Sequence, residues 1–161
     1  MQRPPRFICG IDWADRVNDV AVIDARSMKV HHLRIATSPD GVRELFTMLS
    51  GLQAGHRHSR RQVPVAIETN EGLLVHAMRA KGQPVYQIPP TAMARYRKYR
   101  SITAKKADRS DAVLLATLLR EQWGQIRPLP QTSPTAEAIT QLARAQPRST
   151  ASRTAASQTT D

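Results

Sequence analysis

The residues of this chain best suited to chemistry are four acids: Asp12, Glu68, Asp108 and Asp111. Asp12 ends the apolar run FICGID, and Glu68 ends the apolar run VPVAIE. Asp108 and Asp111 stand three residues apart at the head of an apolar segment that ends near Arg120. Each acid therefore adjoins an element that is expected to be buried, which is where a carboxylate needs a partner.

These four acids are predicted to converge. In sheets with helical crossovers, ligand sites form at the carboxyl ends of the strands, so Asp12 and Glu68 are expected side by side at one edge. Residues three apart on a helix share a face. Leu115 and Leu119 fall on nearly the same face as the two helix acids and are expected to pack on the sheet. Carboxylates gathered in this way repel one another unless a cation lies between them.

The cation that fits such a cluster is Mg²⁺, for which Mn²⁺ can substitute, because hard divalent cations bind oxygen ligands. Two such ions about 3.5–4 Å apart would stabilise the attacking and leaving oxygens of phosphodiester cleavage. Each acid also has a simpler interpretation. Asp12 could be a turn residue at a strand end, Glu68 an acid at a helix start, and Asp108 with Asp111 a solvated first helical turn. Their joint placement favours the metal site.

The other polar candidates are interpreted as structural. Asp15, Asp19 and Asp24 are expected in loops, Glu71 at a helix cap, and Cys9 in the core as a small buried hydrophobe. The histidines show no metal-ligand spacing and are expected on the surface or in loops: His31, His32, His56, His58 and His76.

A basic stretch runs from Arg95 to Arg109 beside the helix acids. Tyr96 and Tyr99 lie within it, which permits stacking on bases or sugars. Its cations would hold phosphates, with a log–log salt slope of about −5 if six of them touched duplex DNA; a solvated basic face is the alternative. The residues expected to bind nucleic acid are Arg95, Arg97, Lys98, Arg100, Lys105, Lys106 and Arg109.

The apolar pattern predicts an α/β fold in which a three-strand meander precedes strand–helix units, giving a mixed sheet with helices on both faces. The expected strands are Phe7–Asp12, Asp19–Asp24, Lys29–Ile35, Val63–Glu68 and Val85–Ile88. The expected helices lie at 37–52, with Ser38 as cap and Pro39 in the first turn, at 69–82, with Thr69 or Asn70 as cap and Gly82 as stop, at 91–101, and from Ala107 to Glu121.

Length and charge agree with one domain that binds a polyanion. The chain has 161 residues and a formal charge of +11, which favours nucleic acid as partner. No apolar run approaches the roughly 20 residues of a membrane span, and no signal peptide is recognisable, so no membrane partner and a cytoplasmic location are expected.

Three motifs carry a family resemblance: GIDWADRVNDVAVID, VAIETNEG and YRSITAKKADRSDAVLLATLLR. Together they resemble the N-terminal domain of DEDD transposases of the insertion-sequence one-ten family, a group of RNA-guided recombinases. The resemblance runs from about Phe7 to Arg127. It implies an RNase H-like (RuvC-like) fold and implies Asp12, Glu68, Asp108 and Asp111 as the metal ligands. It also implies DNA and a structured guide RNA as partners, and a homo-oligomer in the full-length family.

The chain departs from that pattern after Arg127. The family continues through linking helices into a second domain with a serine nucleophile, which this sequence does not contain. We therefore expect a RuvC-like domain at 1–127, and the start of the linking helix with a disordered tail at 128–161, as in a truncated or frameshifted member or an excised fragment. Two alternatives remain: a non-catalytic nucleic-acid-binding remnant, and an endonuclease like the Holliday-junction resolvases.

Overall fold

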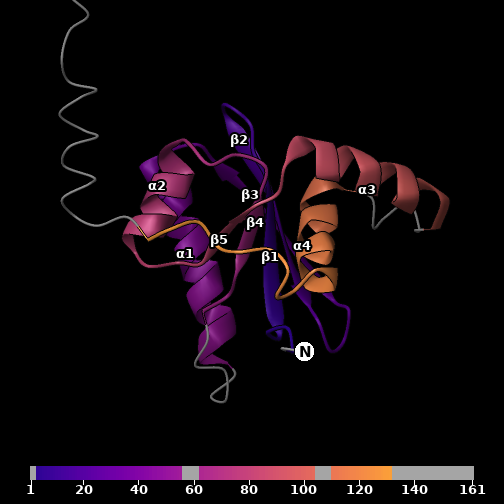
Figure 1. Ribbon diagram of the computed structural model, residues 1–161. Coiled ribbons are helices and arrows are strands. Elements are labelled where there is room, and N and C mark those ends of the chain that lie inside the picture. The colour runs from indigo at the N-terminus through magenta and orange to yellow at the C-terminus, as the bar shows by residue number, and fades with distance from the viewer. Residues whose placement is uncertain (1–2, 56–61, 104–109, 132–161) are drawn as a thin grey trace, which may run out of the picture.

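The computed structural model describes residues 3–55, 62–103 and 110–131. These residues form one sheet and four helices (Figure 1). The strands are β1 (Phe7–Asp12), β2 (Val17–Asp24), β3 (Val30–Ala36), β4 (Val65–Ile67) and β5 (Val85–Gln87). The helices are α1 (Pro39–Ala54), α2 (Leu73–Ala80), α3 (Pro90–Thr103) and α4 (Asp111–Glu121).

The sheet is mixed, as the sequence predicts. Its strand order is β3-β2-β1-β4-β5. β1, β2 and β3 pair antiparallel as a meander, whereas β4 and β5 run parallel to β1. A central first strand with a meander on one side and parallel strands on the other is an RNase H-like arrangement. The parallel pairing brings the carboxyl ends of β1 and β4 to the same edge of the sheet.

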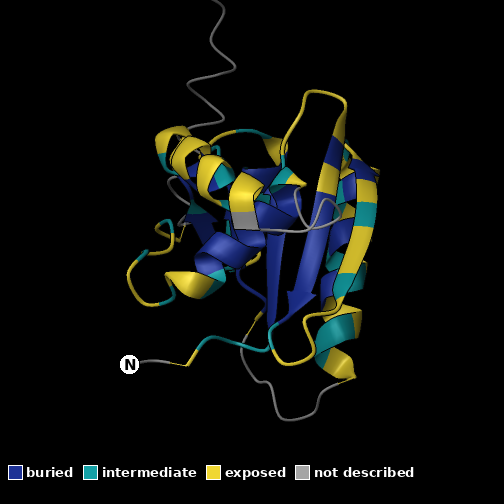
Figure 2. Cartoon of the chain, turned by 90° about the vertical axis from the view of Figure 1, so that its right-hand side faces the viewer, coloured by how far each residue is buried: buried dark blue, intermediate teal, exposed yellow. Residues whose placement is uncertain are grey.

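Helices cover both faces of the sheet, which confirms the predicted layers. α1 and α2 lie on one side, and α3 and α4 lie on the other (Figure 1). The core is divided accordingly: one cluster gathers Ile11, Ile67 and Leu45, and the other gathers Ile8, Leu115 and Leu119. Figure 2 shows the buried strands between helices whose outer surfaces are exposed.

α4 packs directly on β1 because Gly10 has no side chain. A Cβ at Gly10 would lie only 1.9 Å from the carbonyl oxygen of Ala112. α4 is correspondingly the most buried helix surface on this side, with Leu115 and Leu119 fully covered as predicted. The start of α4 is thereby fixed over β1.

The helix starts differ in part from the predictions. Ser38 caps α1 through its side-chain oxygen, with Pro39 in the first turn, as expected. α2, however, begins two to three residues later than predicted: Gly72 is its N-cap, and no side chain caps it. Thr69 instead accepts a hydrogen bond from the Glu71 N–H in a local turn. Neither of the predicted caps, Thr69 and Asn70, is therefore the N-cap of α2.

α4 also begins later than predicted, at Asp111 rather than Ala107, with Ser110 as N-cap. β4 is shorter than predicted and β2 is longer at its start. The predicted strand Val63–Glu68 begins two residues before β4 and ends one residue after it, because the apolar run extends beyond the residues that pair with β1. Asp108 lies outside the described residues, and so does its predicted place in a shared first turn.

Asp24 was interpreted as a loop acid, but it ends a strand, as the expected strand bounds indicated, and it is buried and paired. It is the last residue of β2, only 5% exposed, and Arg6 donates to it through Nε at 3.2 Å and Nη2 at 3.0 Å. Burial alone would raise the pKa of Asp24, but hydrogen bonds from Arg6 and from backbone N–H groups lower it to about 2. The pair closes the end of the β2–β3 hairpin against the N-terminal segment.

Cys9 is fully buried, as predicted, and burial raises the pKa of its thiol far above the usual value. His31 and His32 are exposed, as predicted, and lie on β3. His76 is half-buried on α2, so the prediction of a surface or loop position is wrong for His76. His56 and His58 lie outside the described residues.

After α4 the chain returns across the sheet edge. Leu129 N–H donates to the Val85 carbonyl at 2.7 Å, and Arg79 donates to the Pro130 carbonyl at 2.8 Å. The residues directly after the expected boundary at Arg127 thus pack on β5 and α2. Within the described ranges, no helix has both the length and the apolar character that a membrane crossing requires.

Candidate metal centre

Side-chain alternation places Asp12 on the α4 side of the sheet. Successive side chains of a strand point to opposite faces. Ile8 belongs to the core cluster beneath α4, and Gly10 contacts α4 itself. Asp12 is the next residue of that series, at the carboxyl end of β1, and it is half-buried.

Glu68 reaches the same face by the same rule. Ala66 lies in the cluster beneath α4, whereas Ile67 lies in the opposite cluster. Glu68 follows Ile67, and Ile67 pairs with Ile11 in the parallel register. Asp12 and Glu68 are therefore neighbours at one sheet edge, which confirms the predicted juxtaposition.

Asp111 completes the set from above the sheet. It is the first residue of α4, where Ser110 accepts a hydrogen bond from the Val113 N–H at 3.4 Å. The helix dipole and the free N–H groups of this first turn favour a carboxylate. Because the next residue, Ala112, rests on Gly10, Asp111 is held over the end of β1.

The three acids are close enough to act on one another. The pKa of Asp12 is raised by burial first, and then by the negative charges of Asp111, Asp19 and Glu68, while Arg97 opposes the shift. No described residue donates a hydrogen bond to the Asp12 carboxylate. This position is consequently one at which an additional cation would be stabilised.

Asp19 is a carboxylate that the sequence analysis missed. It was interpreted as a loop acid at the start of the expected strand Asp19–Asp24, but it lies within β2, directly opposite Asp12 in the antiparallel register. Arg34 on β3 pairs with Asp19 at 2.9 Å, and both side chains are well exposed. The alternation in DVAVID, with Ala21 and Ile23 on the α4 face, was the signal that could have placed Asp19 on this face.

Arg97 binds two of the acids. Its Nε donates to Oδ1 of Asp111 at 2.7 Å, and its Nη2 donates to Oδ2 of Asp111 at 3.0 Å and to Oε1 of Glu68 at 2.7 Å. The hydrogen bond with Asp111, followed by the negative charges of both acids, raises the pKa of the guanidinium against a smaller effect of burial. Arg97, which was predicted to bind nucleic acid, contacts these two acids.

The donor set suits a hard cation, although its present arrangement does not. Carboxylate oxygens from β1, β4 and α4 are ligands of the kind that Mg²⁺ prefers. Within the described residues, however, no three acidic, histidine or cysteine side chains stand close enough to hold a metal ion as they are. The Arg97 guanidinium lies where two of these acids meet.

The rest of the basic stretch forms the outer surface of α3. Arg95 and Lys98 are exposed, and the Arg100 guanidinium lies 6.0 Å from the centre of the Tyr96 ring. Tyr96 is only 8% exposed and cannot stack on a base, contrary to prediction, whereas Tyr99 is 60% exposed. Lys105, Lys106 and Arg109 lie outside the described residues.

A shallow hollow beside α3 includes both tyrosines. It is lined by Ala92, Arg95, Tyr96, Tyr99, Leu118 and Gln122. The two rings are 6.4 Å apart between centroids. Exposed cations next to an exposed aromatic ring form a surface suited to a nucleic-acid strand.

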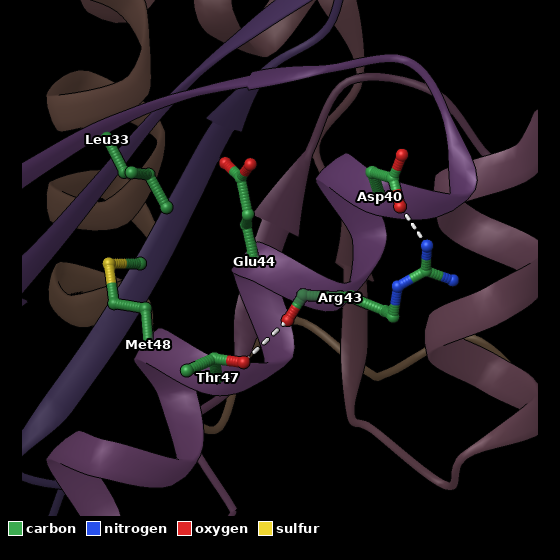
Figure 3. Close-up of a pocket in the computed structure, with 6 residues that line it drawn as sticks. All are labelled: Leu33, Asp40, Arg43, Glu44, Thr47 and Met48. Carbon is green, nitrogen blue, oxygen red and sulfur yellow. Dashed lines mark hydrogen bonds and ion pairs between the residues drawn. The ribbon is translucent and has the colours of Figure 1, made fainter.

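A second hollow lies on the opposite face of the sheet, between β3 and α1 (Figure 3). Its lining residues are Leu33, Asp40, Arg43, Glu44, Thr47 and Met48. Arg43 donates to Asp40, and the Thr47 hydroxyl donates to the Arg43 carbonyl at 2.9 Å. These contacts lie within one helix, and the hollow is separated from the acids by the sheet.

The fold and the edge acids define an RNase H-like protein with carboxylates from two parallel strands and a covering helix. A family model of transposases, DEDD_Tnp_IS110, matches residues 9–160. The chain therefore belongs to the IS110 family of DEDD transposases.

Two relatives illustrate the match. The chain is 45% identical over 139 residues to a mini-circle transposase candidate for IS117 from Streptomyces coelicolor, covering 86% of this chain and 33% of the relative. It is 29% identical over 114 residues to the transposase candidate y4uE from Sinorhizobium fredii, covering 69% of this chain and 30% of the relative. The chain thus spans about a third of the length of the curated relatives it matches.

Proposed function

We propose that this chain is the metal-binding, phosphodiester-cleaving domain of an IS110-family transposase. The observation that supports it best is the placement of Asp12, Glu68 and Asp111 on one face at one sheet edge, from three separate segments of the chain. Asp108 is expected to join them, as the family motif implies. Mg²⁺ bound by these oxygens, with Mn²⁺ as a substitute, would activate a water or hydroxyl nucleophile and polarise the phosphate.

The chain's own residues would perform two tasks. The acids would hold the cation and fix its position through the strands and helix that carry them. The cations of α3, the exposed Arg95 and Lys98 together with the partly buried Arg100, would bind phosphates and bring the backbone toward the acids. Phosphate contacts position a nucleic acid without reading its sequence. Recognition of the DNA sequence in the full-length protein would therefore come from another component, and the family resemblance supports a guide RNA for this role. The resemblance also supports a homo-oligomer.

Calorimetric titration of the purified chain with Mg²⁺ and Mn²⁺ tests the metal site. Binding is expected for the wild-type chain and should be abolished in the double variant Asp12→Asn with Asp111→Asn. A matched control is Asp40→Asn with Glu44→Asn, which removes two acids from α1 on the other face. Binding that survives in the first double variant would refute the assignment.

The observation that Arg97 already neutralises two of the acids favours a second function, nucleic-acid binding without catalysis. Nuclease and strand-transfer assays separate the two. Metal-dependent product supports the first function, and salt-sensitive binding without product supports the second. For either function, Arg95→Gln with Lys98→Gln should weaken binding of a DNA or RNA strand and reduce its salt slope by up to about 2.

A further inference from the structure

Arg97 differs from its neighbours on α3 in the direction of its side chain. Arg95 and Lys98 are exposed to solvent, whereas Arg97 is turned inward and makes three hydrogen bonds with carboxylate oxygens. A planar guanidinium presents donors in a fixed fork, which matches both oxygens of Asp111 and leaves Nη2 to reach Glu68. A helix rich in cations thus sends one of them into the acid cluster.

The oxygens that Arg97 uses are those that a metal ion needs. Both oxygens of Asp111 and one oxygen of Glu68 accept hydrogen bonds from the guanidinium. A cation placed between Glu68, Asp111 and Asp12 would compete for them and would be repelled by the guanidinium charge. Among the described residues, Arg97 is thus the cation that these two acids contact.

We propose that Arg97 is an internal counter-cation that must leave Glu68 and Asp111 before a divalent metal can bind there. The inference rests on the proposed metal site and adds a residue that regulates its loading. With metal absent, Arg97 neutralises the acids and holds α3 against α4 and the end of β4. Asp12, Glu68 and Asp111 would hold the metal once Arg97 had left, and the released guanidinium would lie on the helix that carries the phosphate-binding cations.

The direction of the effect distinguishes this role from ordinary scaffolding. If Arg97 only held the acids in place, its removal would disorder them and weaken metal binding. If Arg97 competes with the metal, its removal strengthens metal binding. Because the three side chains are each about a third exposed, the competing contacts are partly screened, and we expect an effect of about tenfold rather than several orders of magnitude.

The experiment is calorimetric titration of Mn²⁺ and Mg²⁺ into the 161-residue chain without nucleic acid. Arg97→Gln should bind Mn²⁺ about tenfold more tightly than the wild-type chain. Arg97→Lys should fall between them, because an ammonium keeps the charge but cannot make the forked contact. Arg95→Gln is the matched control, with the same chemical change on the same helix, and its metal affinity should equal that of the wild-type chain.

Thermal unfolding gives a second readout. Without metal, Arg97→Gln should melt below the wild-type chain, since its acids lose their counter-cation. With saturating Mn²⁺ the difference should disappear or reverse, whereas a scaffolding role would keep the variant less stable under both conditions. Should the glutamine variant fail to fold, the lysine variant decides in the same way.

The outcomes separate the inference from the function on which it rests. Equal or weaker metal binding by the folded Arg97 variants, with binding still lost in Asp12→Asn with Asp111→Asn, overturns the role of Arg97 and leaves the metal site intact. No metal binding by either the wild-type chain or the Arg97 variants overturns both.

Discussion

Gly10 is the position at which one added methyl group should move α4, and with it Asp111, away from β1. A Cβ there would lie 1.9 Å from the Ala112 carbonyl oxygen, 2.7 Å from the Ala116 nitrogen and 3.0 Å from the Ala112 carbonyl carbon. All three are backbone atoms, so no side-chain rotation relieves the contact. Gly10→Ala must therefore push α4 away from β1.

The expected cost follows from that geometry. Real Cβ contacts essentially never fall below 3.0 Å, so α4 has to withdraw by about 1 Å or more. Overpacking a well-packed core costs about 1–3 kcal/mol, and a rigid backbone contact places this case at the upper end, about 3 kcal/mol. All eight residues from Ala112 to Leu119 are buried, so the withdrawal also opens the core. Asp111 moves with the helix, and metal affinity should fall with stability.

Urea unfolding followed by circular dichroism measures the change in the free energy of unfolding. Gly51→Ala is the matched control: it makes the same substitution inside α1, where nothing lies within 4 Å of the new methyl group. This control should be stabilised by about 0.5–1 kcal/mol through its higher helix propensity. A Gly10→Ala variant within 0.5 kcal/mol of the wild-type chain would refute the packing argument.

Three further predictions concern titratable groups. Burial and neighbouring acids raise the pKa of Asp12, so the wild-type chain loses stability as pH rises above the ordinary carboxyl value; Asp12→Asn should lose this pH dependence and melt higher than the wild-type chain at pH 7 without metal, and an unchanged profile would contradict it. The pKa of Asp24 is lowered from 3.8 to about 2, so its pairing with Arg6 stabilises the fold above pH 3.8 and is lost as pH falls through about 2; Asp24→Asn should cost roughly 2 kcal/mol at neutral pH and flatten the acid limb of the stability curve, as urea titrations at several pH values will measure. Cys9 is fully buried with a raised pKa, so a thiol reagent should label it only after unfolding, and labelling of the native chain at the unfolded rate would disprove its burial.

The elements and two of the acids could be predicted because local signals determine them. FICGID and VPVAIE are apolar runs long enough for buried strands, and each ends on the acid that the structure brings to the sheet edge. The parallel pairing of β1 and β4 then makes Asp12 and Glu68 neighbours without further information. Ser38 and Pro39 carry a helix-start signal that depends only on adjacent residues, and they were placed correctly.

The partners of Asp19 and Arg97 could not be predicted from local signals, although the alternation in DVAVID indicates which face of the sheet Asp19 occupies. Asp19 joins the acids only because the β1–β2 register sets it opposite Asp12, and register depends on pairing between strands. Arg97 stands among similar cations in the sequence, and only the packing of α3 against α4 selects it to turn inward. The start of α2 was misplaced for a related reason. Thr69 and Asn70 have the composition of caps, but the chain makes a turn through Gly72, with φ of 100°, before the helix begins.

The first strand and the last helix of the described fold, β1 and α4, lie against each other, so the described fold is complete only once α4 has been synthesised. β1 leaves the ribosome early and can pair with β2 soon afterwards. The face of β1 that α4 covers stays exposed until α4 has been synthesised, about a hundred residues later. Contacts between such distant segments form slowly, and the uncovered sheet is prone to aggregate while it waits. A nascent chain halted before α4 would therefore expose the apolar face of β1 and would lack Asp111 beside Asp12 and Glu68.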